Sequence, residues 1–202
     1  IWNAEFANGH WTDQHMALIP DDYDAVRAMS QGYASADYYG MGMMPAGHGM
    51  VGFLWQFRHS NLPRTADTSA FFGSVDVTLA YQNRQGDCWQ HVPGRPDFIN
   101  HSEIPWGGGT IYTASCPVEV GDEQRLYFSA TRRSHAWYLN RDLSLNKTNF
   151  RTLVDEGNGR IGFVSWPKWR LFGFKSDPQG TIPFFVRLDS PCEFMLNYEC
   201  EP

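Results

Sequence analysis

Positive charge is scarce in this sequence. Its 202 residues contain 16 Lys and Arg against 22 Asp and Glu, so the formal net charge is −6 with His neutral. This balance excludes a protein that binds nucleic acid through a general positive field. Disorder is excluded as well, because only 19% of the residues are charged whereas 15% are aromatic. The length allows one domain with a sizeable core, since chains of about 150 to 200 residues bury roughly 70% of their unfolded surface.

Long apolar segments are also missing. The longest uncharged run, residues 38–57, has the length of a membrane span but contains five Gly, one Pro and one His. It therefore indicates turns and strands rather than a helix in lipid. Residues 1–5 lack the basic and then apolar pattern of a signal peptide, and a processed or trimmed chain would look the same.

Cysteine is rare, and none of the four cysteines stands in a C-x-x-C pair. Zinc sites and thioredoxin-type redox sites are therefore not indicated, and no other metal-ligand spacing is convincing. Cys192 and Cys200 are the most plausible partners for a disulfide bond. If the protein is secreted we expect them to be joined, with a gain of about 2 to 3 kcal/mol for so short a loop.

Helical periodicity is confined to residues 20–29, where several Asp residues suit the start of a short helix. Most other segments are short, β-branched or aromatic, and separated by Gly, Pro, Asn or Asp. The expected strands are residues 37–44, 50–59, 74–82, 110–120, 124–132, 160–166, 170–174 and 184–188. The sequence therefore predicts an all-β protein.

A weak internal repeat places Trp11 and Trp89, 78 residues apart, just after turns that contain Gly. Two sets of four strands follow from this spacing, the first within residues 37–92 and the second within residues 110–174. Repeated units of four antiparallel strands are typical of β-propeller blades. A β-sandwich of hairpins is the alternative, because the same spacings permit it.

Short motifs spread over most of residues 7–175 point to one family. They are Gly9–Trp11 followed by Pro20–Asp24, Asp37–Met41, Gly52–Trp55, Val75–Tyr81, Gly109–Pro117 followed by Val120–Glu123, and Arg160–Phe163. These segments resemble the five-bladed propeller glycosidases, which include invertases, levansucrases, arabinanases and xylosidases, and their uncharacterised bacterial relatives. The resemblance implies that residues 1–182 form a partial blade and about two full blades. Residues 183–202 would be a final strand segment or the start of a following β domain.

The resemblance also implies partners. About two and a half blades of this size fit in the chain, whereas closed propellers generally have four or more. We therefore expect a C-terminal or internal portion of a longer five-bladed protein, or a ring completed by a second chain. The expected ligand is a carbohydrate, with no nucleic acid, no membrane and no cofactor, although a structural cation in the propeller axis is possible. The expected location is secreted or periplasmic.

Glycosidases of this architecture place acidic side chains at the axial ends of inner strands, with the two carboxylates roughly 5 to 10 Å apart. Asp37 stands immediately before an inner strand, which makes it a catalytic candidate, although a turn-capping Asp is the plainer interpretation. The corresponding position before Thr110 holds Pro105–Gly109 instead of an acid. Glu103 is therefore the candidate for the second carboxylate, with an exposed loop Glu as the alternative.

Arg58 and His59 end the second expected strand. An Arg suits a carboxylate or sulfate on a sugar, and a His transfers protons near neutral pH, so we expect Arg58 to bind substrate and His59 to take part in catalysis. An exposed pair at a strand end is equally compatible with the sequence. Asp76 alternates with Val75 and Val77 and would be a substrate contact or, more simply, a buried partner of an Arg or of backbone amides.

The remaining candidates are substrate-binding residues in loops and at strand ends. Trp106 is expected to stack on a sugar ring, and His48 and Tyr112 complete the set. We predict a glycoside hydrolase that acts through paired carboxylates on a plant or algal polysaccharide or oligosaccharide. One alternative is a non-catalytic glycan-binding propeller module. The other is a polysaccharide lyase that uses His or Tyr with Arg, for which the candidates are His48, His101, His135, Arg132, Arg133 and Tyr112.

Overall fold

The computed structural model describes residues 1–60, 72–135 and 159–171, together with residues 173, 181, 190, 191 and 193. The chain divides into a compact unit of residues 1–171 and a second unit of residues 172–202. The helices and strands given below lie in the first unit. The expected strand at residues 184–188 and the expected disulfide between Cys192 and Cys200 lie outside the described residues.

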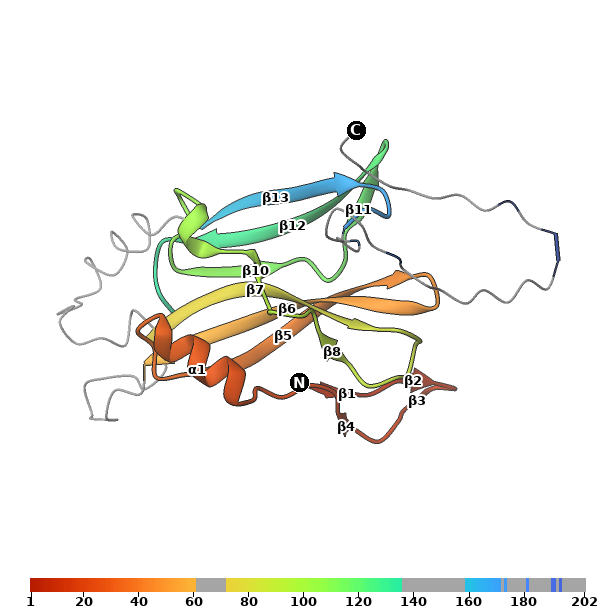
Figure 1. The fold of residues 1–202 in the computed structure, drawn as a ribbon, viewed down its shortest axis with the longest axis horizontal. Helices are drawn as coiled ribbons and strands as arrows, with labels where there is room; N and C mark the ends of the chain where they lie inside the picture. The colour runs from red at the N-terminus through yellow and green to blue at the C-terminus, as the bar shows by residue number, and fades with distance from the viewer. Residues whose placement is uncertain are drawn as a thin grey trace. The chain divides into compact units, whose positions relative to one another are not determined.

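A nine-stranded sheet, curled like half of a barrel, forms the body of the first unit (Figure 1). The chain is all-β apart from one α-helix and one short 3-10 helix in the described ranges, as the sequence predicted. The strands of the sheet are β5 (Ser35–Ala46), β6 (Gly49–Ser60), β7 (Phe72–Gln82), β8 (Gln90–His91), β9 (Asp97–Ile99), β10 (Thr110–Thr113), β11 (Val118–Val120), β12 (Glu123–Thr131) and β13 (Arg160–Pro167).

The first predicted set of strands and the first three segments of the second set are present and share this sheet. Strands β5, β6, β7 and β8 follow one another in antiparallel order, and β12 pairs antiparallel with β10, β11 and β13. The two sets are joined where β10 runs parallel to β7, with Thr110 opposite Val75. Residues 170 and 171, at the start of the expected strand 170–174, are not in a strand.

The expected strand at residues 110–120 is interrupted between β10 and β11. Pro117 has no N–H group to donate to a sheet, which favours a break at this point. The interruption leaves the carbonyl of Ser115 available to the N–H of Met43 at 2.6 Å. Residues 114–117 thus connect the two sets of strands at a second place.

One face of β6 and β7 carries the main apolar core. Side chains alternate between the two faces of a strand, so Phe53, Trp55 and Phe57 share this face of β6. Ten buried residues make up the core cluster, namely Met44, Val51, Phe53, Val77, Ile99, Ile111, Leu126, Phe128, Ala130 and Trp166. Because β10, β12 and β13 supply residues to the cluster, they cover this face of β6 and β7.

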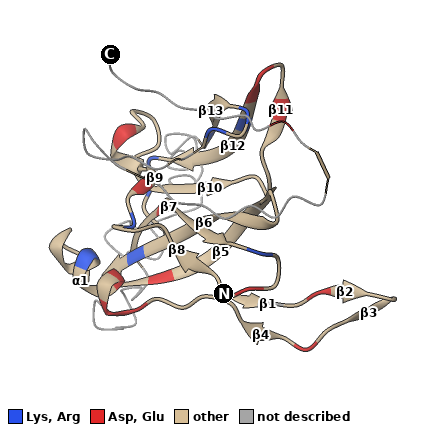
Figure 2. Ribbon diagram, turned by 45° about the vertical axis from the view of Figure 1, so that its right-hand side comes forward, with Lys and Arg blue, Asp and Glu red and all other residues tan. Residues whose placement is uncertain are grey.

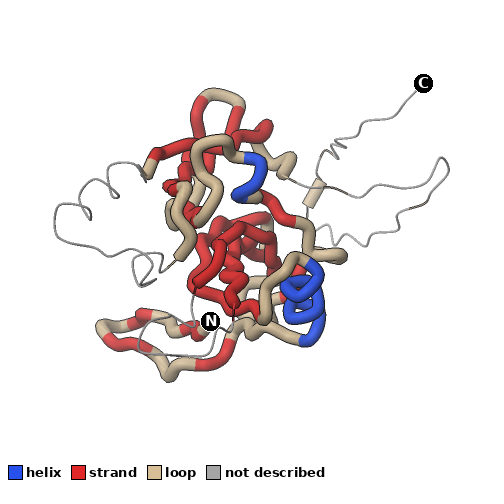
Figure 3. The backbone as a smooth tube through the Cα atoms, turned by 90° about the vertical axis from the view of Figure 1, so that its left-hand side faces the viewer, coloured by secondary structure: helices blue, strands red, loops and turns tan. Residues whose placement is uncertain are grey.

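The opposite face of β6 and β7 carries polar side chains that are also buried, among them Gln56, Arg58 and Asp76. Helix α1 (Asp22–Ser30) contacts β5 beside this face, and Figure 3 shows it next to the strands. The helix lies where the Asp-rich segment predicted it. It begins with a capping box, in which Asp21 and Asp24 bind each other's backbone N–H groups.

The first sixteen residues form a hairpin outside the main sheet. Strand β1 (Trp2–Asn3) pairs with β4 (His15–Met16), and β2 (Phe6–Ala7) pairs with β3 (His10–Trp11). Asn8 and Gly9 make the turn with φ of 53° and 80°, a conformation in which Asn and Gly are favoured in two-residue hairpin turns. Within the described residues, no helix has the length and apolar character needed to cross a membrane.

The outer face of β11, β12 and β13 exposes several apolar side chains beside the ion pair of Arg125 and Glu123, and the Arg125 guanidinium lies 5.0 Å from the centre of the Phe163 ring. Its exposed side chains include Val118, Val120, Tyr127, Ile161 and Phe163. The rings of Tyr127 and Phe163 are 5.7 Å apart between centroids, so the two residues form one continuous patch.

We expect this face to be covered in solution by the rest of a longer chain or by a second copy, because monomers rarely expose large apolar patches. Light scattering should give a mass that rises above 23.1 kDa with concentration. The substitution Phe163→Lys should return the protein to the monomer. A soluble wild-type monomer at every concentration would contradict the expectation and favour a self-contained β-sandwich.

Candidate functional site

Asp37 and His59 lie side by side at one end of the β5–β6 hairpin. Asp37 is opposite Phe57 in the pairing of the two strands, and His59 is two residues further along the same face of β6. The Nε2 atom of His59 is 3.0 Å from Oδ2 of Asp37. The Asp37 side chain is 56% exposed and that of His59 only 7%. The carboxylate is therefore open to solvent, and the imidazole behind it fixes its orientation.

Aromatic rings surround this pair. The buried ring of Phe57 lies 4.6 Å from Tyr39, 5.1 Å from His59 and 4.7 Å from His135 between ring centroids. Tyr39 Oη and His135 Nε2 are 3.2 Å apart. We call Asp37, Tyr39, Phe57, His59 and His135 the Asp37 cluster.

Two local features of the backbone build the Asp37 cluster. A β-bulge between Tyr38 and Gly40 leaves Tyr39 as an extra residue in β5, and bulges commonly redirect a side chain in this way. The N–H of His135 donates to the carbonyl of Gly73 at 2.7 Å, which ties residue 135 to the start of β7. The sequence had singled out Asp37, His59 and His135, but it gave no signal for the role of Tyr39.

Glu103 is not joined to Asp37. It lies in the 3-10 helix η1 (His101–Glu103), and its carboxylate is exposed. Asp37, Phe57, Val75 and Thr110 occupy one row across the sheet, so three strand spacings, about 14 Å along the curled sheet, separate β5 from β10. Glu103 itself lies before β10, in the same short helix as His101, which contacts Asp76. Within the described ranges, no hydrogen bond or ion pair connects the two acids.

The position before Thr110 cannot hold a side chain. The N–H of Gly109 donates to Thr131 at 2.8 Å, and its carbonyl accepts from Val75 at 3.2 Å. A Cβ atom on Gly109 would stand 2.0 Å from the carbonyl oxygen of Arg133. The Gly therefore permits a close approach of two backbones, and an acid is excluded from the place where the resemblance would put one.

Arg58 and Asp76 are buried in a network on the opposite face. The Arg58 side chain is 1% exposed and forms ion pairs with Asp76 and Asp97. Its Nη2 also donates to Gln56 Oε1 at 2.9 Å. Asp76 Oδ1 accepts from the N–H of His101 at 2.6 Å and lies 2.7 Å from its Nδ1. We call these residues the Arg58 network. Asp76 is thus a buried partner of an arginine, and neither charge faces solvent.

A second polar network, which the sequence did not reveal, fixes the start of helix α1. Arg95 binds Asp21 with both terminal nitrogens, at 2.7 and 2.6 Å, and Asp24 at 2.8 Å. Tyr38 donates a hydrogen bond to Asp24, and its oxygen is 3.0 Å from His91 Nε2. We call Asp21, Asp24, Tyr38, His91 and Arg95 the helix-start network. From the sequence, the Asp residues within residues 20–29 were seen only as suited to the start of a short helix.

These contacts shift several pKa values. The hydrogen bonds from Arg95 lower the pKa of Asp21 to about 2. Burial, followed by the hydrogen bond to Asp24, raises the pKa of Tyr38 far above its usual value. Burial, followed by the charge of Arg95, lowers the pKa of His91. Because Tyr38 gives its proton to Asp24, His91 donates from Nε2, and its buried Nδ1 has no partner among the described residues.

Acid should therefore destabilise the protein through His91. The folded state binds a proton on His91 less readily than the unfolded chain, where the pKa is near 6.5. The contribution of the neutral His91 side chain to the free energy of unfolding is complete above that pH and is lost as the pH falls below it. Urea unfolding at pH about 7.5 and about 5.5 should show this loss. The loss should shrink in His91→Gln and persist in His10→Gln, and equal losses in both variants would contradict the prediction.

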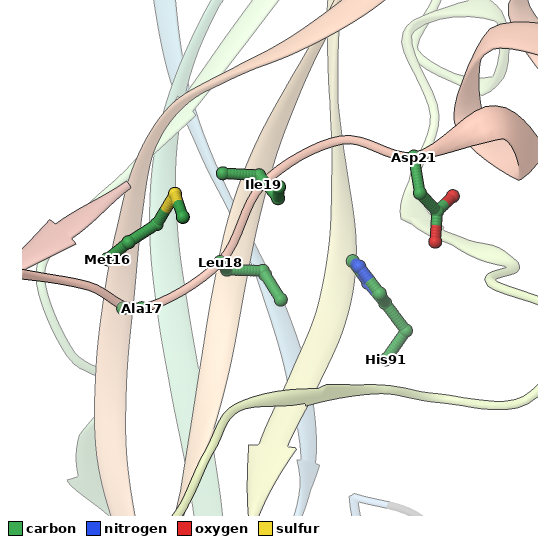
Figure 4. A pocket seen from close by; sticks show the side chains of 6 residues that line it. All are labelled: Met16, Ala17, Leu18, Ile19, Asp21 and His91. Atoms are coloured by element: carbon green, nitrogen blue, oxygen red, sulfur yellow. The ribbon is translucent and has the colours of Figure 1, made fainter.

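A shallow hollow borders the helix-start network. It has a volume of about 290 Å³ and is lined by Met16, Ala17, Leu18, Ile19, Asp21 and His91 (Figure 4). Its walls are mainly apolar, and Asp21 is already engaged by Arg95.

Two other predicted substrate residues are half-buried, and one lies far away. Trp106 is stacked on Phe128 with centroids 5.9 Å apart and an interplanar angle of 3°. Tyr112 packs edge-on against Trp55 at 5.4 Å, and burial raises its pKa to about 12. His48 is exposed in the turn at the other end of the β5–β6 hairpin, roughly 35 Å along the strand from Asp37.

Trp106→Ala should lower the free energy of unfolding by about 2 kcal/mol, because the ring loses its contact with Phe128. The effect should be smaller than for a fully buried Trp, since this side chain is only half-buried. Urea unfolding measures the loss. Calorimetry on the same variant tests the sequence-based prediction that Trp106 also contributes about 1 to 2 kcal/mol to glycan binding. Unchanged stability together with weaker glycan binding would make it a ligand contact only.

No group of three His, Cys, Asp or Glu side chains in the described part of the chain is arranged to hold a metal ion. Cys88 and Cys116 are exposed free thiols.

Compared with protein-family models, with curated proteins and with solved structures, the chain matches none.

Proposed function

We propose that this chain is carbohydrate-active and acts as a glycoside hydrolase on a plant or algal polysaccharide or oligosaccharide. The observation that supports the proposal is the arrangement of the Asp37 cluster. An exposed carboxylate is held by a buried imidazole at 3.0 Å and lies near a partly exposed tyrosine ring. Glycosidases require an oriented carboxylate that reaches the sugar, and aromatic rings provide stacking surfaces for it.

In this proposal Asp37 is the catalytic residue and His59 is a positioning residue. Asp37 would attack the anomeric carbon as the nucleophile or, as the base, take a proton from the water that attacks it, because its carboxylate is more exposed than the His59 imidazole. His59 keeps one oxygen of Asp37 in a fixed position, which reduces the ordering needed before reaction. Glu103 is retained as the proposed second carboxylate. It lies in η1, whose His101 contacts Asp76 in the Arg58 network.

A panel of uncharged and uronate-containing oligosaccharides tests the proposal. Hydrolysis releases new reducing ends and leaves no double bond, so reducing-end labelling and ultraviolet absorbance together identify the reaction. We expect reducing ends without absorbance from a conjugated double bond. Failure to cleave any member of the panel would contradict a hydrolase.

A lyase is the second candidate, because Tyr39 Oη and His135 Nε2 are 3.2 Å apart in the same cluster. A Tyr or His can remove the proton next to a uronate carboxylate, while an Arg neutralises that carboxylate. Arg133 precedes His135 by two residues. Tyr39→Phe separates the candidates, since it should abolish elimination but leave most of the hydrolysis by Asp37.

A non-catalytic glycan-binding module is the third candidate. It is favoured by Gly109, where the close contact with Arg133 excludes an acid. In that case the wild-type protein and Asp37→Asn should bind the same oligosaccharides, and neither should cleave them.

A further inference from the structure

The N-terminal hairpin presents apolar side chains on one of its faces. Trp2 lies opposite Met16, and Phe6 lies opposite Trp11. Residues 2 and 6 are an even number of positions apart in one strand of the hairpin, and the register shift between the two pairs falls in the other strand, so all four side chains share one face. Trp2, Phe6 and Trp11 are 66%, 62% and 70% exposed. Soluble proteins rarely expose such a group unless it contacts a partner.

The rings of Phe6 and Trp11 are tilted against each other. Their centroids are 5.2 Å apart and their planes make an angle of 56°, so a planar ligand can lie flat on only one of them. A cation at the end of a slender side chain needs only one ring face, and Trp is the strongest aromatic partner for a cation. The protein already contains this type of contact, because Arg95 lies 4.9 Å from the centre of the Tyr23 ring.

The charge of the hairpin favours a cationic partner. Residues 1–16 contain Glu5 and Asp13 and neither Lys nor Arg. No ion pair between described residues involves either acid. Figure 2 shows acidic segments and no basic ones along the hairpin. Glu5 alternates with Phe6 and points to the other face, so it attracts a cation through the field around the hairpin, which extends about 8 to 10 Å in physiological salt.

The backbone of the hairpin favours a polypeptide over a small cation. The pairs β1–β4 and β2–β3 are two-stranded sheets with no third strand in the described part of the chain. The edges of such a ribbon carry unpaired N–H and C=O groups, which an extended peptide binds by adding a strand. Every second side chain of the added strand then lies on the face that carries Trp2 and Trp11.

We propose that the N-terminal hairpin is a docking site for an extended, basic segment of a partner protein. The segment adds a strand to the edge of the hairpin, and its Lys or Arg side chains, at alternate positions, lie over the rings of Trp2 and Trp11. Glu5 and Asp13 attract the segment electrostatically. This docking site goes beyond the proposed function and does not need Asp37 to be catalytic.

Calorimetric titration tests the docking site with synthetic peptides. The first alternates Lys with Thr, the second has Gln in place of Lys, and the third is the Lys peptide with a methyl group on every second backbone nitrogen. We expect only the first peptide to bind, and Trp11→Ala to weaken its binding about tenfold. Trp169→Ala is the matched control, because Trp169 is 64% exposed but lies after β13. Trp11→Ala should unfold at the same urea concentration as the wild type, since its side chain is mostly exposed.

A second pair of variants tests the charge. Glu5→Gln combined with Asp13→Asn should weaken binding of the Lys peptide and should make the remaining affinity less sensitive to added salt. Asp122→Asn removes an exposed acid from the turn before β12 and should change neither quantity.

Several results would overturn the proposal. Equal binding of the Lys and Gln peptides would remove the role of charge, and full binding of the methylated peptide or of spermidine would make the hairpin a site for small cations. Unchanged affinity in Trp11→Ala, or no binding of the Lys peptide to the wild type, would contradict it directly. A smaller mass for Trp11→Ala than for the wild type in light scattering would make this face a contact between two copies.

Asp37→Asn distinguishes the docking site from the proposed hydrolase. This variant should keep its binding of the Lys peptide, whereas Trp11→Ala should keep the turnover of any short oligosaccharide that the wild type cleaves. Loss of peptide binding in Asp37→Asn would contradict a separate docking site.

Discussion

Replacing Arg58 with Met is expected to lower the free energy of unfolding by about 3 to 5 kcal/mol. Met fills much of the same volume, but it leaves Asp76 without its guanidinium partner, whereas Asp97 keeps an ion pair with Arg27 at 3.1 Å. Asp76 is completely buried, so its charge cannot be solvated by water in compensation. Removing one partner of a buried ion pair costs far more than the pair itself contributes. Urea unfolding followed by tryptophan fluorescence measures the loss.

Two further variants test whether the loss comes from an uncompensated charge. Arg125→Met removes an exposed ion pair with Glu123 and should cost less than about 1 kcal/mol. Adding Asp76→Asn to Arg58→Met should recover part of the stability, because the remaining buried charge disappears. If the double variant loses more free energy of unfolding than the two single variants lose together, the cause is lost packing instead.

The predicted role of Arg58 also shows what can and cannot be predicted from the sequence. Arg58 and His59 were expected to bind and process one sugar together. Neighbouring residues in a strand point to opposite faces, and β6 follows this rule. Arg58 therefore enters the polar network below α1, whereas His59 reaches Asp37. The alternation of buried residues was readable from the sequence, and it already separates the two side chains.

Other parts of the molecule depend on contacts between distant residues. The strands and the short helix follow from local patterns, and most were placed within a few residues. The bond between Arg95 and Asp21 joins positions 74 residues apart, and no local pattern connects them. Tyr39 enters the Asp37 cluster through a β-bulge that only the pairing of β5 with β6 defines. A single sequence reveals the local propensity for strands, but it does not reveal how β5 and β6 are aligned.

Asp37→Asn is expected to reduce the turnover of a cleaved oligosaccharide by at least about a thousandfold. Asn has the same shape as Asp but can neither attack an anomeric carbon nor carry the charge that acid–base chemistry needs. The melting temperature should stay nearly unchanged, because the side chain is 56% exposed. Initial rates from reducing-end labelling, with melting curves on the same samples, measure both quantities.

His59→Gln and Asp122→Asn complete this test. If His59 positions Asp37, His59→Gln should lower turnover less than Asp37→Asn does and should change the pH profile of the rate, which a purely structural defect would not do. Asp122 is an exposed acid in the turn before β12, so Asp122→Asn should leave turnover unchanged. Full activity in Asp37→Asn would remove Asp37 from the reaction. The exposed carboxylate held by His59 would then be a binding contact, and the glycan-binding module would become the better explanation.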